Sequence, residues 1–275
     1  LNKSHTTLIY SVKKLEEQLS VQLVEVKGKR ATLTDHGQSL LRRANSMLDQ
    51  ARELEDLSQQ IAAGVESEIT VAMDHLCDPS LLYRPMAHYL RQNSATSIQV
   101  VETSLSKTSD MVTSAQADIA IITLPVTNYP AQAFSLTSMV PVVSTEHPLA
   151  QQASLTMADF ATHCQIVIRD LGASQTNEQA QNVGWLKSNQ RVTVDNFDHA
   201  FRAVEQGVGF CRLPTHIVAK RNQGQLQVLN VEESDCYQVP LHLTLPKGAK
   251  TGPAARFFYE LLLNGAWSES GEKCQ

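Results

Sequence analysis

Apolar positions near the start of the chain repeat with the period of an α-helix. Leu8, Val12, Leu15 and Leu19 follow one another at intervals of four, three and four residues, which places them on one helical stripe. Ser4 is a favourable N-cap, so we expect a helix from Ser4 to about Gln18. The opposite face and its edges carry mainly hydroxyl and basic side chains, namely Lys3, Thr6, Tyr10, Lys13, Lys14 and Glu17.

A short hairpin pattern follows this helix. Val21, Leu23, Thr32 and Leu33 flank a basic tip, Lys27-Gly28-Lys29-Arg30, in which glycine supplies a turn residue. Hydroxyl and basic side chains can contact phosphates and base edges, and a helix fits the major groove. The two elements together favour the second half of a winged helix-turn-helix over an ordinary solvated helix beside a hairpin. The candidate DNA contacts are Ser4, Thr6, Thr7, Tyr10, Lys13, Lys14, Lys27, Lys29 and Arg30.

A long second helix is predicted from Thr34, which can cap it. Apolar residues then alternate by four and three from Leu40 to Val65, broken only by the polar Ser58. This repeat is typical of the seam of a coiled coil, whereas the alternative is a helix packed on its own domain. Its length favours dimerisation, with the contact residues Leu40, Ala44, Met47, Ala51, Leu54 and Ile61.

From Gly64 onward the pattern changes to alternating strands and helices. Strands are predicted over 69–73, 98–101 and 118–122, with helices over 79–92 and 107–116. This β-α-β-α-β order predicts a mostly parallel sheet covered on both faces. Residues 140–144 form a further β-rich run. A second α/β unit follows, with strands over 165–169 and 191–194, a helix within 177–189 and another over 197–206. We expect a strand over 241–245 to return to the first lobe and a closing helix over 254–263.

Two glycines follow the last helix of the second α/β unit. Gly207 is expected to end that helix, and Gly209 to permit a tight turn. A dinucleotide-binding fingerprint would need a third glycine at the start of a following helix. Arg212 and Pro214 stand there instead, which excludes that interpretation.

Several motifs, in order along the chain, resemble those of LysR-type transcriptional regulators. The run from Leu1 to Glu16 resembles the family's recognition segment, in which a Ser-capped helix ends in Ile/Val-Lys/Arg-x-Leu-Glu. Leu19-Ser20-Val21-Gln22-Leu23 resembles its next step, and Leu33-Thr34-Asp35-His36-Gly37 resembles its Leu-Thr-x-x-Gly motif. Farther on, the run from Gly207 to Pro214 is similar to its Gly-x-Gly…Leu-Pro segment. Val24 and Val26 stand where the family usually has Phe and Arg, which removes one basic phosphate contact.

The resemblance implies an architecture and partners. It implies an α/β chain with a partial winged helix-turn-helix (1–34), a linker helix that forms the dimer contact (35–66) and a polar tail (268–275). Between them lies a two-lobed, periplasmic-binding-protein-like (type II) effector domain (67–267), with lobe I about 67–142 and 243–267 and lobe II about 143–242. Two further helices are expected ahead of Leu1. The implied partners are a small-molecule effector, a second copy in a homodimer or homotetramer, and double-stranded promoter DNA with two-fold related half-sites.

Charge and composition agree with this interpretation. The net charge is −5, yet residues 1–43 hold eight Lys/Arg against four Asp/Glu, and the remainder fifteen against twenty-four. A basic end on an acidic body suits a DNA reader attached to another domain. There is no apolar run long enough to cross a bilayer and no signal-peptide pattern, so we expect a cytoplasmic protein without a membrane partner. The five scattered cysteines contain no Cys-x-x-Cys pair and are expected to be buried thiols, namely Cys77, Cys164, Cys211, Cys236 and Cys274.

Candidate ligand residues follow the predicted strands. In an open parallel sheet, ligands bind at the carboxyl ends of the strands, where hydroxyls and amides at helix starts can hold a small polar or anionic molecule. The alternative role of such residues is helix capping. This rule selects His75, Leu76, Cys77, Ser104, Ser106, Thr123, Asn196 and Phe197.

No catalytic constellation is present in the sequence. His75 and Cys77 could form a metal pair, or a nucleophile with its base, but a third partner is missing. We therefore expect no metal, no cofactor and no enzymatic activity. The competing hypothesis is a solute-binding protein or a binding-fold enzyme, which a secretion signal or clustered acid and base residues would favour.

Overall fold

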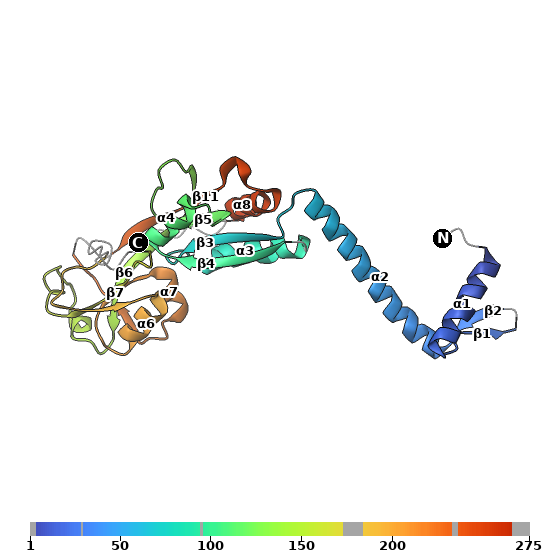
Figure 1. Cartoon of the computed structure of the whole chain (residues 1–275). Helices are drawn as coiled ribbons and strands as arrows, with labels where there is room; N and C mark the ends of the chain where they lie inside the picture. Colours follow the sequence, from blue (N-terminus) through green and yellow to red (C-terminus); the bar gives the residue numbers. More distant parts are fainter. Residues whose placement is uncertain (1–3, 29, 94–95, 173–183, 233–235, 266–275) are drawn as a thin grey trace. The chain divides into compact units, whose positions relative to one another are not determined.

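The chain separates into two compact units (Figure 1), Leu1–Ala63 and Gly64–Gln275, called here the first unit and the second unit. The computed structural model describes residues 4–28, 30–93, 96–172, 184–232 and 236–265. None of the helices in these ranges combines the length and the apolar composition that a bilayer crossing needs.

The first unit contains two helices and a hairpin: α1 (His5–Leu19), β1 (Val24–Lys27), β2 (Arg30–Leu33) and α2 (Asp35–Ala62). Both predicted caps are confirmed. The Ser4 hydroxyl accepts the Thr7 N–H at 3.4 Å, and the Thr34 hydroxyl accepts the Gly37 N–H at 3.0 Å. The hairpin begins at Val24 and not at Val21 as predicted, because the Val21 N–H returns to the Glu16 carbonyl at the end of the helix.

One carboxylate connects α1 to the hairpin. Glu16 Oε1 accepts the backbone N–H groups of Leu23 and Val24 at 2.7 and 2.9 Å. These two bonds hold the pKa of Glu16 below its usual range. At the same place Gly37 lies against the backbone of Leu23, where a Cβ would be only 2.1 Å from the carbonyl oxygen. The start of α2 is thereby packed closely against the loop that precedes β1.

Both helices of the first unit leave apolar side chains exposed. On α1, Leu8, Leu15 and Leu19 are each 45% exposed, and on α2 Met47 and Leu54 are 65% and 66% exposed. The periodic stripes predicted from the sequence are therefore present, but they are not the inside of a core. Basic and hydroxyl side chains of α1 are exposed as well, including Thr6, Thr7, Tyr10, Lys13 and Lys14.

The second unit is built on a seven-stranded sheet of order β10-β6-β11-β5-β3-β4, with β9 also paired to β6. Its strands are β3 (Glu68–Asp74), β4 (Ser97–Thr103), β5 (Ile119–Ile122), β6 (Ala131–Ser144), β9 (Cys211–Pro214), β10 (Leu226–Val228) and β11 (Tyr237–Thr244). A separate two-stranded parallel sheet contains β7 (Cys164–Ile168) and β8 (Gln190–Val194).

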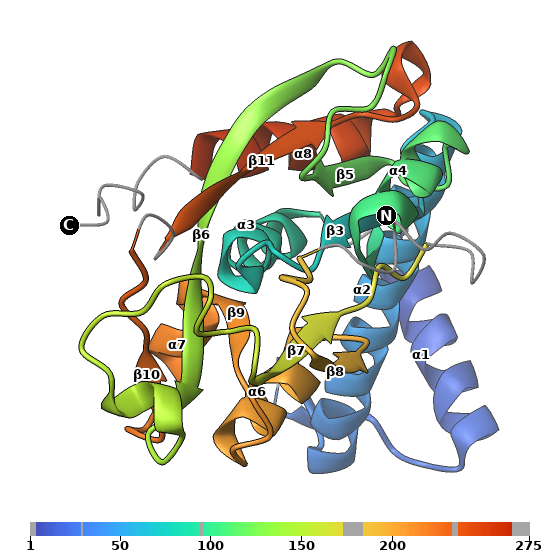
Figure 2. The same cartoon turned by 90° about the vertical axis from the view of Figure 1, so that its left-hand side faces the viewer.

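The prediction of a mostly parallel sheet is right for one part of this sheet and wrong for the whole. β3 pairs in parallel with β4 and β5, as the alternating pattern indicated. The remaining pairs are antiparallel, because the long strands β6 and β11 run side by side in opposite directions (Figure 2) and β11 then joins β5. β6 begins at Ala131, nine residues before the predicted strand. Its first part pairs with β11, and residues 139–144 pair with β9 and β10.

The helices of the second unit are α3 (Pro79–Gln92), α4 (Leu105–Thr113), α6 (Phe197–Glu205), α7 (Thr215–Arg221) and α8 (Pro253–Gly265), with short 3-10 turns η1 (Pro148–Gln151) and η2 (Gly248–Lys250). The predicted helix within 177–189 falls largely outside the described residues, and 184–189 are not helical. The short α7 and β10 were not predicted, since each has few residues to show a period.

The core of the second unit lies around β3 and the facing helices. Ile69, Val71, Leu82, Phe258 and Leu262 are almost completely buried in one apolar cluster. The same cluster continues to β7 and α6 through Ile166 and Phe197, so the elements that surround the candidate site share one core.

The two glycines after α6 serve different purposes. Gly207 ends the helix with a φ of +73°, as predicted. Gly209 is not among the residues with positive φ, so it is not needed for a left-handed backbone conformation. A Cβ at Gly209 would lie 2.1 Å from the Cys164 carbonyl oxygen, because the following residue, Phe210, pairs with β7. Gly209 therefore permits two backbones to approach closely.

Candidate functional site

A cavity of about 250 Å³ lies where β3, β4 and β5 end and β7, β9 and β11 come close. Five of the eight ligand residues selected from the sequence line it, namely His75, Leu76, Ser104, Thr123 and Phe197. The rest of the wall is mostly apolar: Leu105, Leu124, Met139, Ile166, Val167, Ile168, Cys211 and Val239, with Gln165, Arg169, Asp170, Gly184, Arg212 and Tyr237. Pockets for drug-sized ligands usually measure about 300–1,000 Å³, so this volume suits a smaller molecule.

The other three selected residues do not line the cavity. Cys77 is buried, and its thiol donates to the Asp78 carbonyl at 3.6 Å. Asn196 caps α6, since its side-chain oxygen accepts the His199 N–H at 2.9 Å. Ser106 lies in the first turn of α4, and its N–H donates to Asp170.

Cys77 and Cys211 are poor nucleophiles. Burial raises the pKa of the Cys77 thiol far above its usual range, and burial raises that of Cys211 to about 12. Cys164 and Cys236 are half-buried, and so less enclosed than predicted, while Cys274 lies outside the described residues. No group of three or more His, Cys, Asp or Glu side chains in the described ranges is placed to hold a metal ion.

The floor of the cavity is organised by Asp74, the last residue of β3, which is completely buried. Asp74 Oδ1 accepts the Leu76 N–H at 3.0 Å. Asp74 Oδ2 accepts the Leu105 N–H at 3.1 Å and the hydroxyls of Thr108 and Thr123 at 3.4 and 3.2 Å. One carboxylate thus joins the loops that follow β3, β4 and β5.

His75 presents its ring to the cavity beside this carboxylate. The ring meets Phe197 edge-on, with centroids 4.8 Å apart, and its Nδ1 is buried without a hydrogen-bond partner. Burial lowers the pKa of His75 and raises that of Asp74. A neutral imidazole with a buried, unpaired nitrogen is a group that a polar ligand atom could satisfy.

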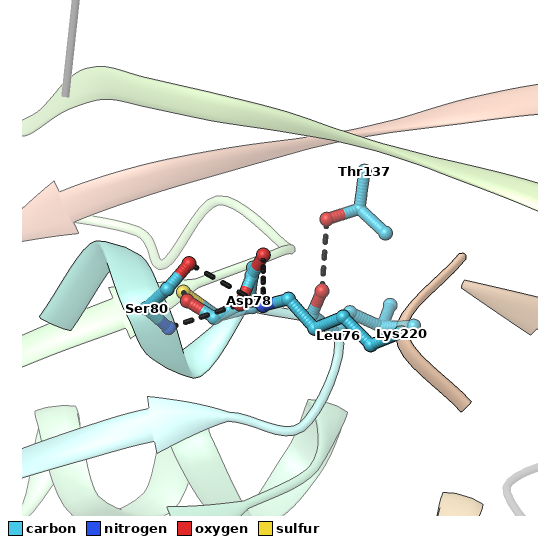
Figure 3. A network of polar contacts seen from close by, with 6 residues as sticks. Leu76, Asp78, Ser80, Thr137 and Lys220 are labelled. Carbon is cyan, nitrogen blue, oxygen red and sulfur yellow. Dashed lines mark hydrogen bonds and ion pairs between the residues drawn. The ribbon is translucent and has the colours of Figure 1, made fainter. Parts of the chain in front are cut away.

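The loop that carries His75 and Leu76 is also held from its other side (Figure 3). The Thr137 hydroxyl of β6 donates to the Leu76 carbonyl at 2.8 Å. The Lys220 ammonium of α7 donates to both carboxylate oxygens of Asp78, at 2.6 and 2.8 Å, and Asp78 in turn caps α3 through the Ser80 N–H. The position of the loop therefore depends on elements far away in the sequence.

A second carboxylate, Asp170, lies two residues beyond β7 at the start of α4. Asp170 accepts the Ser104 hydroxyl at 3.1 Å and the Ser106 N–H at 3.3 Å. The Ser104 hydroxyl itself accepts the Leu171 N–H at 2.7 Å. Because Asp170 follows a predicted strand, the rule that selected the other candidates could have found it.

Arg212 and Tyr237 supply a cationic and aromatic part of the wall. The Arg212 guanidinium carbon lies 5.1 Å from the centroid of the Tyr237 ring. Two further polar residues of the wall have partners of their own: Gln165 bonds Gly184 and Leu186, and Arg169 pairs with Asp195 at 2.8 Å. Sequence reasoning missed Arg212 and Tyr237, since their place here depends on how β9 and β11 pair with β6.

Comparisons with known proteins agree with this architecture. The family model described as LysR substrate binding domain matches residues 62–267. The chain belongs to the LysR family of transcriptional regulators. One relative is the uncharacterized HTH-type transcriptional regulator YeeY of Escherichia coli K12, 25% identical over 225 residues that cover 80% of this chain and 72% of YeeY. The relatives of this LysR-family chain are regulators, so it is a transcriptional regulator with an effector-binding domain and not an enzyme.

Solved structures show the same fold. The Synechocystis PCC6803 CcmR regulatory domain, solved in complex with 2-PG, matches with a TM-score of 0.61 at 15% identity, over 74% of this chain and 98% of that one. A full-length OxyR variant from Pseudomonas aeruginosa matches with a TM-score of 0.55 at 18% identity, over 96% of this chain and 90% of that one. The full-length match extends the likeness to both units of the LysR-family chain.

Thr123→Val tests the role of the buried Asp74 network. The valine keeps the shape but removes one of the donors to the Asp74 carboxylate, so the free energy of unfolding should fall by about 1–3 kcal/mol. Chemical denaturation of both proteins measures the difference. Thr113→Val is the control, because the Thr113 hydroxyl bonds the Asp110 carbonyl on the exposed surface, and its effect should stay within about 0.5 kcal/mol. Equal effects of the two substitutions would contradict the network.

Proposed function

We propose that this LysR-family protein is a sequence-specific, DNA-binding regulator whose activity is set by a small molecule in the cavity of the second unit. The observation that supports the effector site best is the convergence of three strand ends, with His75, Ser104 and Thr123, on one mostly apolar cavity. The CcmR regulatory domain, which has the same fold, is described in complex with 2-PG. The effector lies between two lobes, I at about 67–142 and 243–267 and II at about 143–242.

The DNA contacts are proposed for the first unit. Thr6, Tyr10 and Lys13 are exposed on α1, and Gly28 has a φ of +68° at the turn of the hairpin. Arg30 lies on the exposed strand β2, while the side chain of Lys27 and all of Lys29 lie outside the described residues. We propose that α1 reads base edges in the major groove and that the basic hairpin contacts phosphates. Promoter DNA also implies a cytoplasmic protein.

The exposed stripe of α2 supports a homodimer. Met47, Leu54 and Ile61 recur at the spacing of a coiled-coil seam and are each more than half exposed. Exposed apolar residues with a sustained heptad spacing gain stability when a second copy covers them. We propose that the α2 helices pair, that two dimers can form a tetramer, and that effector binding changes the spacing of the DNA-binding units on two-fold related half-sites.

DNA binding is tested with substitutions on α1 and the hairpin. Lys29→Ala with Arg30→Ala should weaken binding to every sequence and lower the slope of log K against log salt by about 1 for each lost phosphate contact. Thr6→Ala or Tyr10→Ala should change sequence preference, by about 1–3 kcal/mol for a lost base contact. Fluorescence anisotropy with labelled duplexes over a salt series measures both effects.

Arg52→Ala provides the control for the basic hairpin, because Arg52 is an exposed arginine of α2 that pairs with Asp49. It should leave the salt slope unchanged. If affinity and preference are the same in all of these variants, α1 and the hairpin do not form the DNA interface.

Leu54→Asp tests the dimer. The aspartate places a charge in the apolar seam, so the dimer should dissociate, and light scattering should report the mass of a monomer. Gln50→Asp adds the same charge to an exposed polar position of α2 and should leave the dimer intact. Dissociation by both substitutions, or by neither, would mean that the seam does not hold the copies together.

Leu124→Asp tests the effector site. Leu124 lines the cavity but is 51% exposed, so the charge should disturb the apolar wall without disturbing the core. A metabolite that raises the melting temperature of the unmodified protein should lose that effect in Leu124→Asp. Leu136→Asp, at a similarly exposed position outside the cavity, should keep it. A shift that survives Leu124→Asp would place the effector elsewhere.

A further inference from the structure

The first turn of α4 is the place at this cavity that is best arranged to hold an anion. The first N–H groups of any helix lack intrahelical partners and carry the positive end of the helix dipole. Here they lie beside the Ser104 hydroxyl, which lines the cavity. An unoccupied first turn would therefore offer both backbone and hydroxyl donors to a carboxylate or phosphate.

In this protein every one of those donors already has an acceptor within the chain. The Leu105 N–H goes to Asp74 at 3.1 Å, and the Ser106 N–H goes to both oxygens of Asp170 at 3.3 Å. The N–H groups of Lys107 and Thr108 bond the Ser104 carbonyl at 2.8 and 3.3 Å. Ser104 stands at the N-cap but makes no side-chain cap to its own helix; its hydroxyl donates to Asp170 at 3.1 Å.

The segment that carries Asp170 fits closely on this turn. Gly172 N–H donates back to the Asp170 carboxylate at 3.2 Å, and Leu171 N–H donates to the Ser104 hydroxyl at 2.7 Å. A Cβ on Gly172 would lie only 2.3 Å from the Lys107 nitrogen, so glycine is required for this approach. Asp170 is 5% exposed and Ser104 is completely buried. An external anion would have to break several buried hydrogen bonds and leave a buried carboxylate without its donors.

We propose that Asp170 is a specificity-determining residue that occupies the anion position of α4 from within the chain. The effector then carries no carboxylate or phosphate at its α4 end and is recognised there by shape and apolar contact. Among the groups that line the cavity, His75 Nδ1 is buried without a hydrogen-bond partner, and the Arg212 and Tyr237 side chains form another part of the wall. This description of the effector rests on the proposed function of the cavity, whereas the occupancy of the α4 turn by Asp170 does not.

Chemical rescue by formate tests the proposal on the full chain. Asp170→Ala removes the carboxylate and frees the Ser104 hydroxyl and the Ser106 N–H, so the variant should melt below the unmodified protein. Formate is a bare carboxylate that can enter the vacated position and stabilise the folded state by mass action. We expect about 100 mM formate to raise the melting temperature of Asp170→Ala by about 2–4 °C relative to chloride at equal ionic strength. The unmodified protein should show no difference between the two salts.

Three controls separate rescue from a general salt effect. Asp170→Asn keeps the side-chain volume in the turn, so formate should not stabilise it. Asp195→Ala removes a different carboxylate, the exposed partner of Arg169, and should not respond to formate either. Ser104→Ala combined with Asp170→Ala should lose most of the rescue, since one donor to the anion is gone.

Each possible result either supports or contradicts the proposal. Equal formate stabilisation of the unmodified protein and Asp170→Ala would overturn it, because an anion would then reach α4 despite Asp170. If Asp170→Ala does not fold in chloride, its soluble yield after refolding is compared in formate and chloride. Recovery in formate alone supports the proposal, and no recovery in formate contradicts it. Neither outcome depends on DNA or on an effector, so failure here is distinct from failure of the effector site tested with Leu124→Asp.

Discussion

The buried carboxylate of Asp74 is the constraint on which the cavity of the second unit depends. It accepts hydrogen bonds from the loops that follow β3, β4 and β5, so three strand ends are held at one point. Among the residues that it fixes is Leu105, whose φ of +26° is unusual for a side chain with a Cβ. Loss of these bonds would leave a buried carboxyl group without partners, and the geometry is therefore strongly specified.

Side chains of this protein cap the helices that begin beside the cavity, and these caps shape its chemistry. The helix starts nearest to it are closed by side chains of this protein: Asp78 at α3, Asp170 at α4 and Asn196 at α6. Binding folds with open helix starts can hold anions by backbone donors alone. In this chain the cavity wall also contains an imidazole, a guanidinium beside a phenol ring, and apolar surface. If the cavity holds the effector as proposed, recognition would depend on its walls and not on these helix ends.

The two units use apolar surface in opposite ways. In the second unit the periodic apolar positions of β3, α3 and α8 are buried against one another in a continuous core. In the first unit the equally periodic stripes of α1 and α2 are exposed. An apolar stripe that is exposed within its own unit can be covered by another copy of the chain. This is the physical reason for proposing that the protein forms an oligomer.

Local sequence patterns alone predicted much of the secondary structure. Helical periods, caps and alternating strands correctly predicted α1, α2, α3 and the β3–β5 core, because those signals depend on neighbours within one or two turns. Five cavity residues followed from strand ends for the same reason. The antiparallel course of β6 and β11, the close backbone approach at Gly209 and the contributions of Arg212 and Tyr237 were decided only by the tertiary structure. Each depends on pairing between segments that lie far apart in the chain. The local sequence pattern does not specify which distant strand will be the partner.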